Sequence, residues 1–441
     1  MYERSRIFFC VFFFYPTFVA LMKFKKTALL FIFITILVDV IGIGIILPII
    51  PELIMELTGE GIDMAVIYGM WLTTAFAGMQ FLFSPVLGEI SDRYGRRPIL
   101  LIALLGLSID YLIHAWAATI TWLFLGRFLA GITGASFTVA SAYIADVSTK
   151  ENKAKNFGLI GAAFGLGFII GPGIGGFFGE INIRLPFYIA AALTFANFLF
   201  GWFFVPESLS AENRRSINIL KMIPGVSLAA LRNYKGVLLL ILAFFLANLA
   251  GQALPSTWSY YGIERYQWNP REIGGSLMVV GLLVAIVQGF LVGMLVKKFG
   301  KKVVVTAGFL LWTVGMFLFS LANEPWMLYA FLIPYALGGV AGPTVQGLIS
   351  NQVSEKEQGN LQGSITGLVS ITAILGQLIF SPVFYFFIRP EGNVYFPGAP
   401  YTLASFFLIV AFLCATLAMK RINLSDETDS ETVDTEEVMA E

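Results

Sequence analysis

The stretch GEISDRYGRR, from Gly88 to Arg97, decides the class of this chain, because a weaker copy, GMLVKKFGKK, recurs from Gly293 to Lys302. Glycine opens both copies, a second glycine follows seven residues later, and a basic pair closes each copy. Long apolar runs lie on both sides of each copy. A basic turn repeated between apolar hairpins is typical of membrane carriers built from two related halves.

The composition excludes a soluble protein. Hydrophobic residues make up 57% of the 441 residues and charged residues only 13%, with a mean hydropathy of +0.80, whereas a soluble domain is about a quarter charged. The net charge is zero, so the chain has no basic excess for binding nucleic acid. The only cysteines, Cys10 and Cys414, lie far apart in the sequence, and we expect neither a disulfide framework nor a metal site.

Apolar runs long enough to cross about 30 Å of hydrocarbon occur twelve times. They lie near residues 27-49, 64-87, 98-117, 121-145, 157-179, 186-205, 237-260, 273-296, 303-322, 326-350, 361-387 and 399-419. All are expected to be helices, because an unpaired backbone amide in lipid costs several kcal/mol and no run alternates like a barrel strand. We therefore predict an all-α membrane protein in which twelve transmembrane helices form two pseudo-symmetric six-helix bundles.

The polar segments between these runs divide the chain into parts. We expect an N-terminal extension at 1-26, a six-helix bundle at 27-205, a cytoplasmic central loop at 206-236, a second bundle at 237-421 and a disordered acidic tail at 422-441. Most Lys and Arg residues lie in the central loop, in loops after even-numbered runs and near both ends, which places both termini in the cytoplasm. The apolar run at 7-21 is too short to cross, and it is either an interfacial segment or a stretch upstream of a true start at Met22.

Charged residues inside a membrane span cost about 2.5 to 3.5 kcal/mol each on insertion scales, so each is a functional candidate by default. Asp39 lies thirteen residues after Lys26, and Asp110 lies thirteen after Arg97, which puts both acids about 20 Å from the cytoplasmic ends of their helices. Arg127 lies about 9 Å from the opposite side, at the same level of the bilayer. A carboxylate there can be charged beside Arg127 or neutral when desolvated, as proton coupling requires. Alternatively, Arg127 only neutralises the acids and holds the bundle together.

The repeated loop is predicted to act as a latch. Asp92 lies where two helices nearly meet, so its carboxylate can accept bonds from backbone amides at a helix N-terminus and from arginines across the turn. These arginines are Arg93, Arg96 and Arg97. The alternative is that they only fix the topology. Lys297 replaces the acid in the second copy, which we expect to do little beyond anchoring.

Four further polar residues are candidates. Asp146, at the cytoplasmic end of the fourth run, is either a partner of the latch or a solvated helix end. Gln80 and Gln252 either contact the substrate or join neighbouring helices. His114, the only histidine, lies four residues after Asp110 on the same helical face, where it is a candidate for a proton relay or for substrate contact. A single histidine near an outer helix end is more often interfacial, which is the expectation we favour.

Glycines at four-residue spacing mark the fifth run. Gly167, Gly171, Gly175 and Gly176 are expected to leave one smooth helical face on which another backbone can pack closely, and Pro172 adds a kink. Ordinary helix packing explains this spacing equally well.

The chain resembles the major facilitator superfamily and, within it, the twelve-helix drug/proton antiporters, particularly the tetracycline efflux proteins. GEISDRYGRR resembles the loop signature of the superfamily, and further likeness lies in the runs that contain Asp39 to Gly44, Leu107 to Tyr111, Leu125 to Phe128 and Gly167 to Gly176. The resemblance implies gating roles for the latch residues, and it makes Gly-Pro-x-x-Gly-Gly a mark of exchangers. It also places Gln80 and Gln252 near the substrate cavity.

The chain departs from tetracycline carriers in its second half. The resemblance leads us to expect a histidine in the eighth span and an acid in the ninth, but the sequence has Val284, Ala285 and Ile286 in the eighth and Trp312 in the ninth. A second half without charges suits an uncharged, zwitterionic or aromatic solute better than a metal-chelated drug.

We therefore predict proton-coupled efflux of a small organic solute, such as a drug, antibiotic or metabolite, by alternating access across a bacterial inner membrane. The alternative is an uptake carrier, either a proton symporter or a facilitator, for a small metabolite. An enzyme is not expected, because the sequence shows no nucleophile–base pair, metal cluster or phosphate loop. The expected partners are the solute, protons and the lipid bilayer, with no nucleic acid and no cofactor, and the protein is expected to be a monomer.

Overall fold

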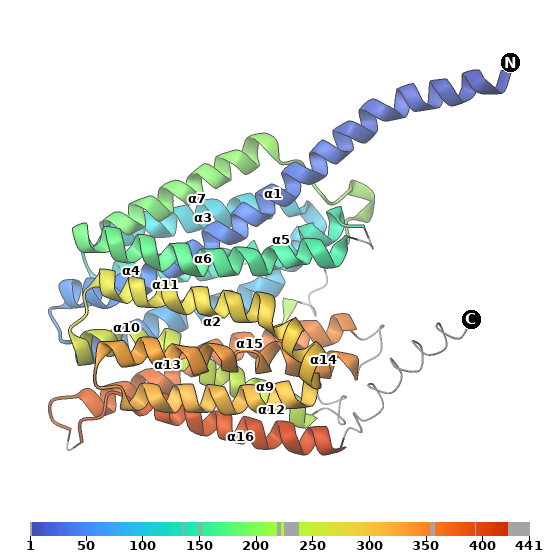
Figure 1. Ribbon diagram of the computed structural model, residues 1–441. Coiled ribbons are helices and arrows are strands. Elements are labelled where there is room, and N and C mark those ends of the chain that lie inside the picture. Colours follow the sequence, from blue (N-terminus) through green and yellow to red (C-terminus); the bar gives the residue numbers. More distant parts are fainter. Residues whose placement is uncertain are drawn as a thin grey trace. The chain divides into compact units, whose positions relative to one another are not determined.

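The computed structural model describes residues 2–134, 136–149, 152–217, 222–224, 238–352, 358–392 and 394–421, and it describes side chains from residue 27 onward except at 153–155, 358–360 and 421. All regular elements of these residues are helical (Figure 1). They are α1 (Tyr2–Thr58), α2 (Ile62–Tyr94), α3 (Arg96–Trp116), α4 (Ile120–Thr133), α5 (Ser136–Val147), α6 (Lys153–Ile181), α7 (Leu185–Phe204), η1 (Ala211–Asn213), α9 (Leu238–Gly251), α10 (Ala253–Tyr266), α11 (Pro270–Ile286), η5 (Val287–Leu291), α12 (Val292–Leu321), α13 (Pro325–Gly338), α14 (Ala341–Asn351), α15 (Gln358–Ile388) and α16 (Ala399–Arg421).

Within the described residues, 11 helical segments are long and apolar enough to cross a membrane. The longest, Pro270–Leu321, has 52 residues and contains both the run expected at 273-296 and the run expected at 303-322. Gly300 lies between these two runs with a non-helical backbone at φ 75°. Each other segment corresponds to one expected run. The all-α membrane fold is therefore confirmed, and a count of twelve crossings follows if Gly300 divides the longest segment.

The expected extension at 1-26 is helical from Tyr2 and continues into the first crossing within α1. An interfacial location for it remains a prediction. The expected central loop is described at 206–217 and 222–224, where it contains the short 3-10 helix η1. The rest of that loop and the acidic tail at 422-441 lie outside the described residues.

The chain forms two compact units. The first unit is Met1–Val226 with Gly262–Leu282, and the second is Ser227–Tyr261 with Leu283–Glu441. In the first unit, buried side chains of α1, α3 and α5, among them Phe31, Leu100 and Tyr143, form a continuous apolar core. Large apolar side chains such as Phe203 (71% exposed) and Phe290 (74% exposed) remain on the surface, as expected of a protein solvated by lipid.

The glycines of α6 allow two close helix contacts within the first unit. A Cβ added at Gly171 would lie 2.5 Å from the carbonyl oxygen of Ile41, and one at Gly175 would overlap the carbonyl oxygen of Ile45, so α1 packs backbone to backbone on this face. Gly167 faces α1 as well.

Gly176 belongs to a different face of α6, so the prediction of a single smooth face is wrong for this residue. A Cβ added at Gly176 would lie 2.7 Å from the carbonyl oxygen of Pro270 and 3.0 Å from Cα of Gly274, both in α11. The reason is geometric, because consecutive residues of a helix point about 100° apart. The helix itself continues without interruption through Pro172.

Candidate functional site

Asp110, His114 and Arg127 form a polar cluster between α3 and α4. Arg127 Nη2 donates to Asp110 Oδ2 at 2.6 Å, and Arg127 Nε donates to His114 Nε2 at 3.1 Å. His114 Nδ1 lies 2.9 Å from the main-chain oxygen of Asp110 and 3.0 Å from its Oδ1. The side chains of Asp110 and His114 are 0% exposed. The structure thus contains the ion pair between Asp110 and Arg127 that the helical rise predicted.

The residues around the cluster explain how it fits between the helices. A Cβ added at Gly126 would lie 2.5 Å from both Asp110 Oδ1 and His114 Cε1, so a glycine before Arg127 leaves room for the pair. Phe187 of α7 covers the imidazole at 5.4 Å between ring centroids, and the Arg127 guanidinium lies 5.6 Å from the ring centroid of Phe76. The favoured expectation that His114 is interfacial is wrong, because these contacts enclose its ring completely.

Asp39 lies apart from this cluster. Its Oδ2 accepts a short hydrogen bond from Ser136 Oγ, at the first residue of α5. Its Oδ1 is buried and has no hydrogen-bond partner in the described part of the chain. The expectation that both acids face Arg127 therefore holds for Asp110 and not for Asp39, whose pairing with a serine was not predicted.

Two of the predicted polar side chains lie where a helix ends. Helix α4 ends at Thr133, and Gln80 Nε2 donates to the carbonyl oxygen of the next residue, Gly134, at 2.9 Å. Gln252 lies at the interruption between α9 and α10 in the second unit, where it packs against Gly376 of α15. Broken helices within a membrane are tolerated where they are buried in protein or line a cavity. Substrate contact by Gln80 and Gln252 remains a prediction.

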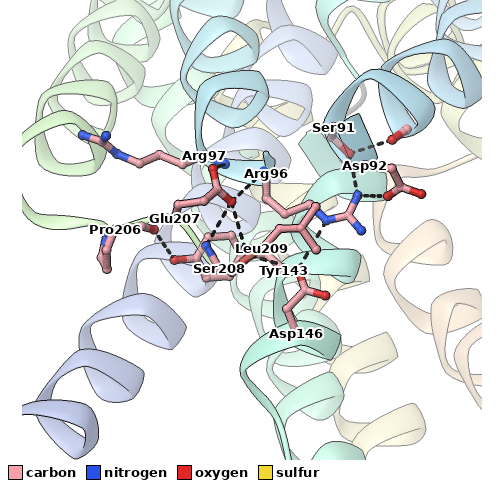
Figure 2. A network of polar contacts seen from close by, with 11 residues as sticks. Ser91, Asp92, Arg96, Arg97, Tyr143, Asp146, Pro206, Glu207, Ser208 and Leu209 are labelled. Carbon is pink, nitrogen blue, oxygen red and sulfur yellow. Dashed lines mark hydrogen bonds and ion pairs between the residues drawn. The ribbon is translucent and has the colours of Figure 1, made fainter. Parts of the chain in front are cut away.

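The loop between α2 and α3 lies in a network of polar contacts, shown in Figure 2 and called the latch network below. Its charged members are Asp92, Arg96, Arg97, Asp146 and Glu207. Arg96 forms an ion pair with Asp92, donates from Nη1 to Ser91 Oγ at 2.7 Å, and donates from Nε to Asp146 Oδ2 at 3.3 Å. Asp146 Oδ2 also accepts from Ser208 Oγ at 3.0 Å. One guanidinium therefore connects the end of α2 with the end of α5, and the expectation of a contact between Asp146 and the latch is confirmed.

Glu207, and not Asp92, accepts from the first amides of α3. Its carboxylate accepts from the main-chain N–H groups of Arg96 at 2.8 Å and Arg97 at 3.2 Å. A Cβ at Gly95, which has φ 111°, would overlap Glu207 Oε2, so only glycine fits this approach. The expectation that Asp92 accepts from these amides is wrong, because Glu207 accepts from them instead, whereas the expected pairing of Asp92 with an arginine across the turn is confirmed for Arg96. The sequence feature that pointed to Glu207 was its position directly after the sixth apolar run.

The other two arginines of the loop have separate contacts. Arg97 Nη2 donates to the main-chain oxygen of Trp202 at 2.5 Å, which ties the start of α3 to the end of α7. The Arg93 guanidinium lies 5.3 Å from the ring centroid of Tyr94, its neighbour in sequence. Gating roles for the loop residues remain predictions.

Comparison with known proteins identifies the family of the chain. The family model described as Major Facilitator Superfamily matches residues 32–379 and 240–438. The chain belongs to the major facilitator superfamily. It is 40% identical over 360 residues to the tetracycline resistance protein, class C, of Escherichia coli, covering 82% of this chain and 90% of that protein. It is 34% identical over 389 residues to the class H protein of Pasteurella multocida, covering 88% of this chain and 96% of that protein.

Solved structures share the fold of this superfamily member. The human organic anion transporter MFSD10 (TETRAN) aligns with a TM-score of 0.68 and 22% identity, over 89% of this chain and 99% of that one. The nucleoside transporter NupG aligns with a TM-score of 0.69 and 14% identity, over 90% of this chain and 99% of that one. The protein is thus a multi-pass membrane transporter of small molecules and not an enzyme.

The second copy of the loop, in the second unit of this superfamily member, keeps one contact of the first. The side-chain oxygen of Asn351 accepts from Lys301 Nζ at 2.9 Å when its side-chain nitrogen donates to the main-chain oxygen of Gly347 at 3.2 Å. By the 205-residue offset between the copies, Lys301 and Asn351 correspond to Arg96 and Asp146. The contact is retained with one charge instead of two.

Proposed function

We propose that this transporter exports a small organic solute in exchange for protons across the bacterial inner membrane, with both termini in the cytoplasm. The tetracycline resistance relatives, at 34% to 40% identity, support export. The observation that carries the proposal is the different pairing of two carboxylates in apolar helices. Asp110 is compensated by Arg127, whereas one oxygen of Asp39 is buried without a partner in the described residues.

Asp39 is the group that a proton neutralises in this scheme. An ionised carboxylate without a cation is costly inside a membrane, and binding a proton removes that cost. The proton arrives from the outer side and is released to the cytoplasm. Because α1 carries Asp39 and packs directly on the glycines of α6, a change of charge at Asp39 acts on the α1–α6 contact.

The latch network holds one face of the first unit closed. Arg96, Asp146 and Glu207 join α2, α3, α5 and the segment after α7, and all of these contacts must break before the helix ends can separate. The cargo is an uncharged, zwitterionic or aromatic solute that the protein carries as a monomer.

The test is transport into inverted membrane vesicles energised with a pH gradient, with candidate compounds added one at a time. A compound that enters the vesicles and dissipates the gradient is exported in the intact cell, whereas an uptake carrier would accumulate the compound in intact cells instead. Asp39→Asn is expected to abolish proton-driven transport while expression stays intact, and Asp110→Asn, which leaves Arg127 without its carboxylate partner, is expected to do the same. Glu60→Gln, at an exposed position between α1 and α2, is the matched control. Undiminished proton-driven transport by Asp39→Asn would overturn the proposal.

A further inference from the structure

His114 has both ring nitrogens engaged inside the first unit. Nε2 faces the Nε–H of Arg127 at 3.1 Å, and Nδ1 faces the main-chain oxygen of Asp110 at 2.9 Å. The side chain is 0% exposed, and it is the only histidine of the chain. Neither of these nitrogens is needed for the exchange as proposed above.

Arg127 determines which nitrogen of His114 carries the hydrogen. A guanidinium has only donors, so the nitrogen that faces Arg127 Nε must offer a lone pair. Nε2 is therefore unprotonated, the hydrogen is on Nδ1, and the imidazole is neutral. A proton added to Nε2 would point at the Nε–H of Arg127, so protonation of His114 and its bond to Arg127 exclude each other.

The charged groups around the ring are few. Asp110 lies on the same helix and Arg127 on α4, while α7 contributes the apolar ring of Phe187. Arg184, just before α7, donates to the carbonyl oxygen of Ala117 at 2.6 Å, beyond the end of α3. The charge of the cluster is thus set by Asp110, His114 and Arg127, and in the described state it sums to zero.

We propose that His114 is the second proton-binding group of the carrier and that Arg127, while bonded to Nε2, prevents its protonation. When Arg127 leaves, a proton from the outer side binds Nε2, and the imidazolium replaces the guanidinium as the positive partner of Asp110. Its Nδ1–H stays bonded to the main-chain oxygen of Asp110 and lies beside Oδ1, with Nδ1 and Oδ1 3.0 Å apart, so the carboxylate keeps a counter-ion in the membrane. The proton leaves Nε2 toward the cytoplasm when Arg127 returns.

This inference rests on the proposed function and narrows the cargo. Uptake of the proton raises the net charge of the cluster from zero to plus one and frees a guanidinium. Like charges repel strongly in a medium of low dielectric constant. Of the solutes proposed above, a zwitterion bound with its ammonium group beside the cluster would therefore be released by the same proton, which gives exchange rather than co-transport.

The single histidine makes a direct test possible. Nitrogen NMR of the full-length protein, labelled with 15N-histidine and placed in lipid nanodiscs, reports the state of His114 alone. At neutral pH we expect a neutral ring with hydrogen on Nδ1, and in Arg127→Met we expect the Nε2–H form to appear. A wild-type ring that carries hydrogen on Nε2 at neutral pH would overturn the assignment.

The second measurement counts protons. His114→Asn places an amide N–H where Nδ1–H lies, so this variant keeps the bond to the main-chain oxygen of Asp110 but cannot carry the charge. We expect the number of protons exchanged per solute to fall by one in this variant, and His114→Gln serves as a second variant in case the first does not fold. An unchanged ratio in a folded variant refutes the role of His114. The proposed exchange itself is tested by proton-driven efflux of the wild-type protein and by Asp39→Asn, neither of which changes His114, so the two failures are distinguishable.

Discussion

Removing the carboxylate of Glu207 should open the latch. Besides the two amides of α3, this side chain accepts from the main-chain N–H groups of Ser208 at 3.0 Å and Leu209 at 3.1 Å. The first amides of a helix have no partner within the helix, so Arg96 and Arg97 depend on this acceptor. Loss of a helix cap costs about 0.5–2 kcal/mol, and loss of a negative charge at a helix N-terminus costs about 0.3–1 kcal/mol more.

We therefore expect Glu207→Ala to lower the free energy of unfolding by about 2 kcal/mol, which is roughly 30-fold in the equilibrium constant. Glu207→Gln keeps one acceptor oxygen and loses the charge, so about half of that loss is expected. The assay is unfolding of the purified protein in mixed micelles with sodium dodecyl sulfate, followed by circular dichroism. Transport in inverted vesicles is measured in parallel.

The matched control is Glu212→Ala, an exposed acid five residues further along the same segment. Gly95→Ala gives an independent approach, because its methyl group would displace the carboxylate of Glu207. If Glu207→Ala unfolds like Glu212→Ala, or if the effects of Gly95→Ala and Glu207→Ala simply add, the capping argument is refuted.

Two further changes test the packing of α6 and the latch. Gly175→Ala should cost about 1–3 kcal/mol through overpacking against α1, whereas Gly158→Ala in the same helix, with no atom within 4 Å of its added Cβ, should cost nothing; equal unfolding of the two would contradict the backbone contact. Asp146→Ala removes an acceptor from Arg96 and should cost about 1 kcal/mol, while Asp146→Asn should cost less, because Asn351 shows that an amide accepts a similar bond. Unfolding measured at low and high salt checks the second pair, and a greater loss with Asn than with Ala would refute it.

The sequence predicted those features that depend on residues close together in the chain. Hydropathy located the helices, because each crossing must be long and apolar by itself. Counting residues along α3 and α4 was enough to bring Asp110 and Arg127 together, since the rise of a helix is fixed. The glycines and basic pairs of the duplicated loop indicated that the chain consists of two related halves.

What the sequence did not reveal depends on contacts between distant segments. Glu207 caps a helix that begins 111 residues earlier, and nothing local distinguishes it from other acids after a span. Asp39 bonds to Ser136, 97 residues away, and a hydroxyl inside a span has many possible partners. The burial of His114 depends on Phe187 from α7, so its place near a helix end suggested the wrong environment.

Gly95 and Gly300, the second glycines of the two loop copies, show what the two halves share and where they differ. Gly95 and Gly300 both have a positive φ, of 111° and 75°, yet, among the described residues, only Gly95 of the two has a carboxylate where its side chain would be. Both halves thus share the backbone bend, whereas the second copy has Lys297 at the position of Asp92. An alignment of the two halves is best anchored on these glycines, because side chains rarely adopt their positive φ, and not on the charges, which differ between the two copies.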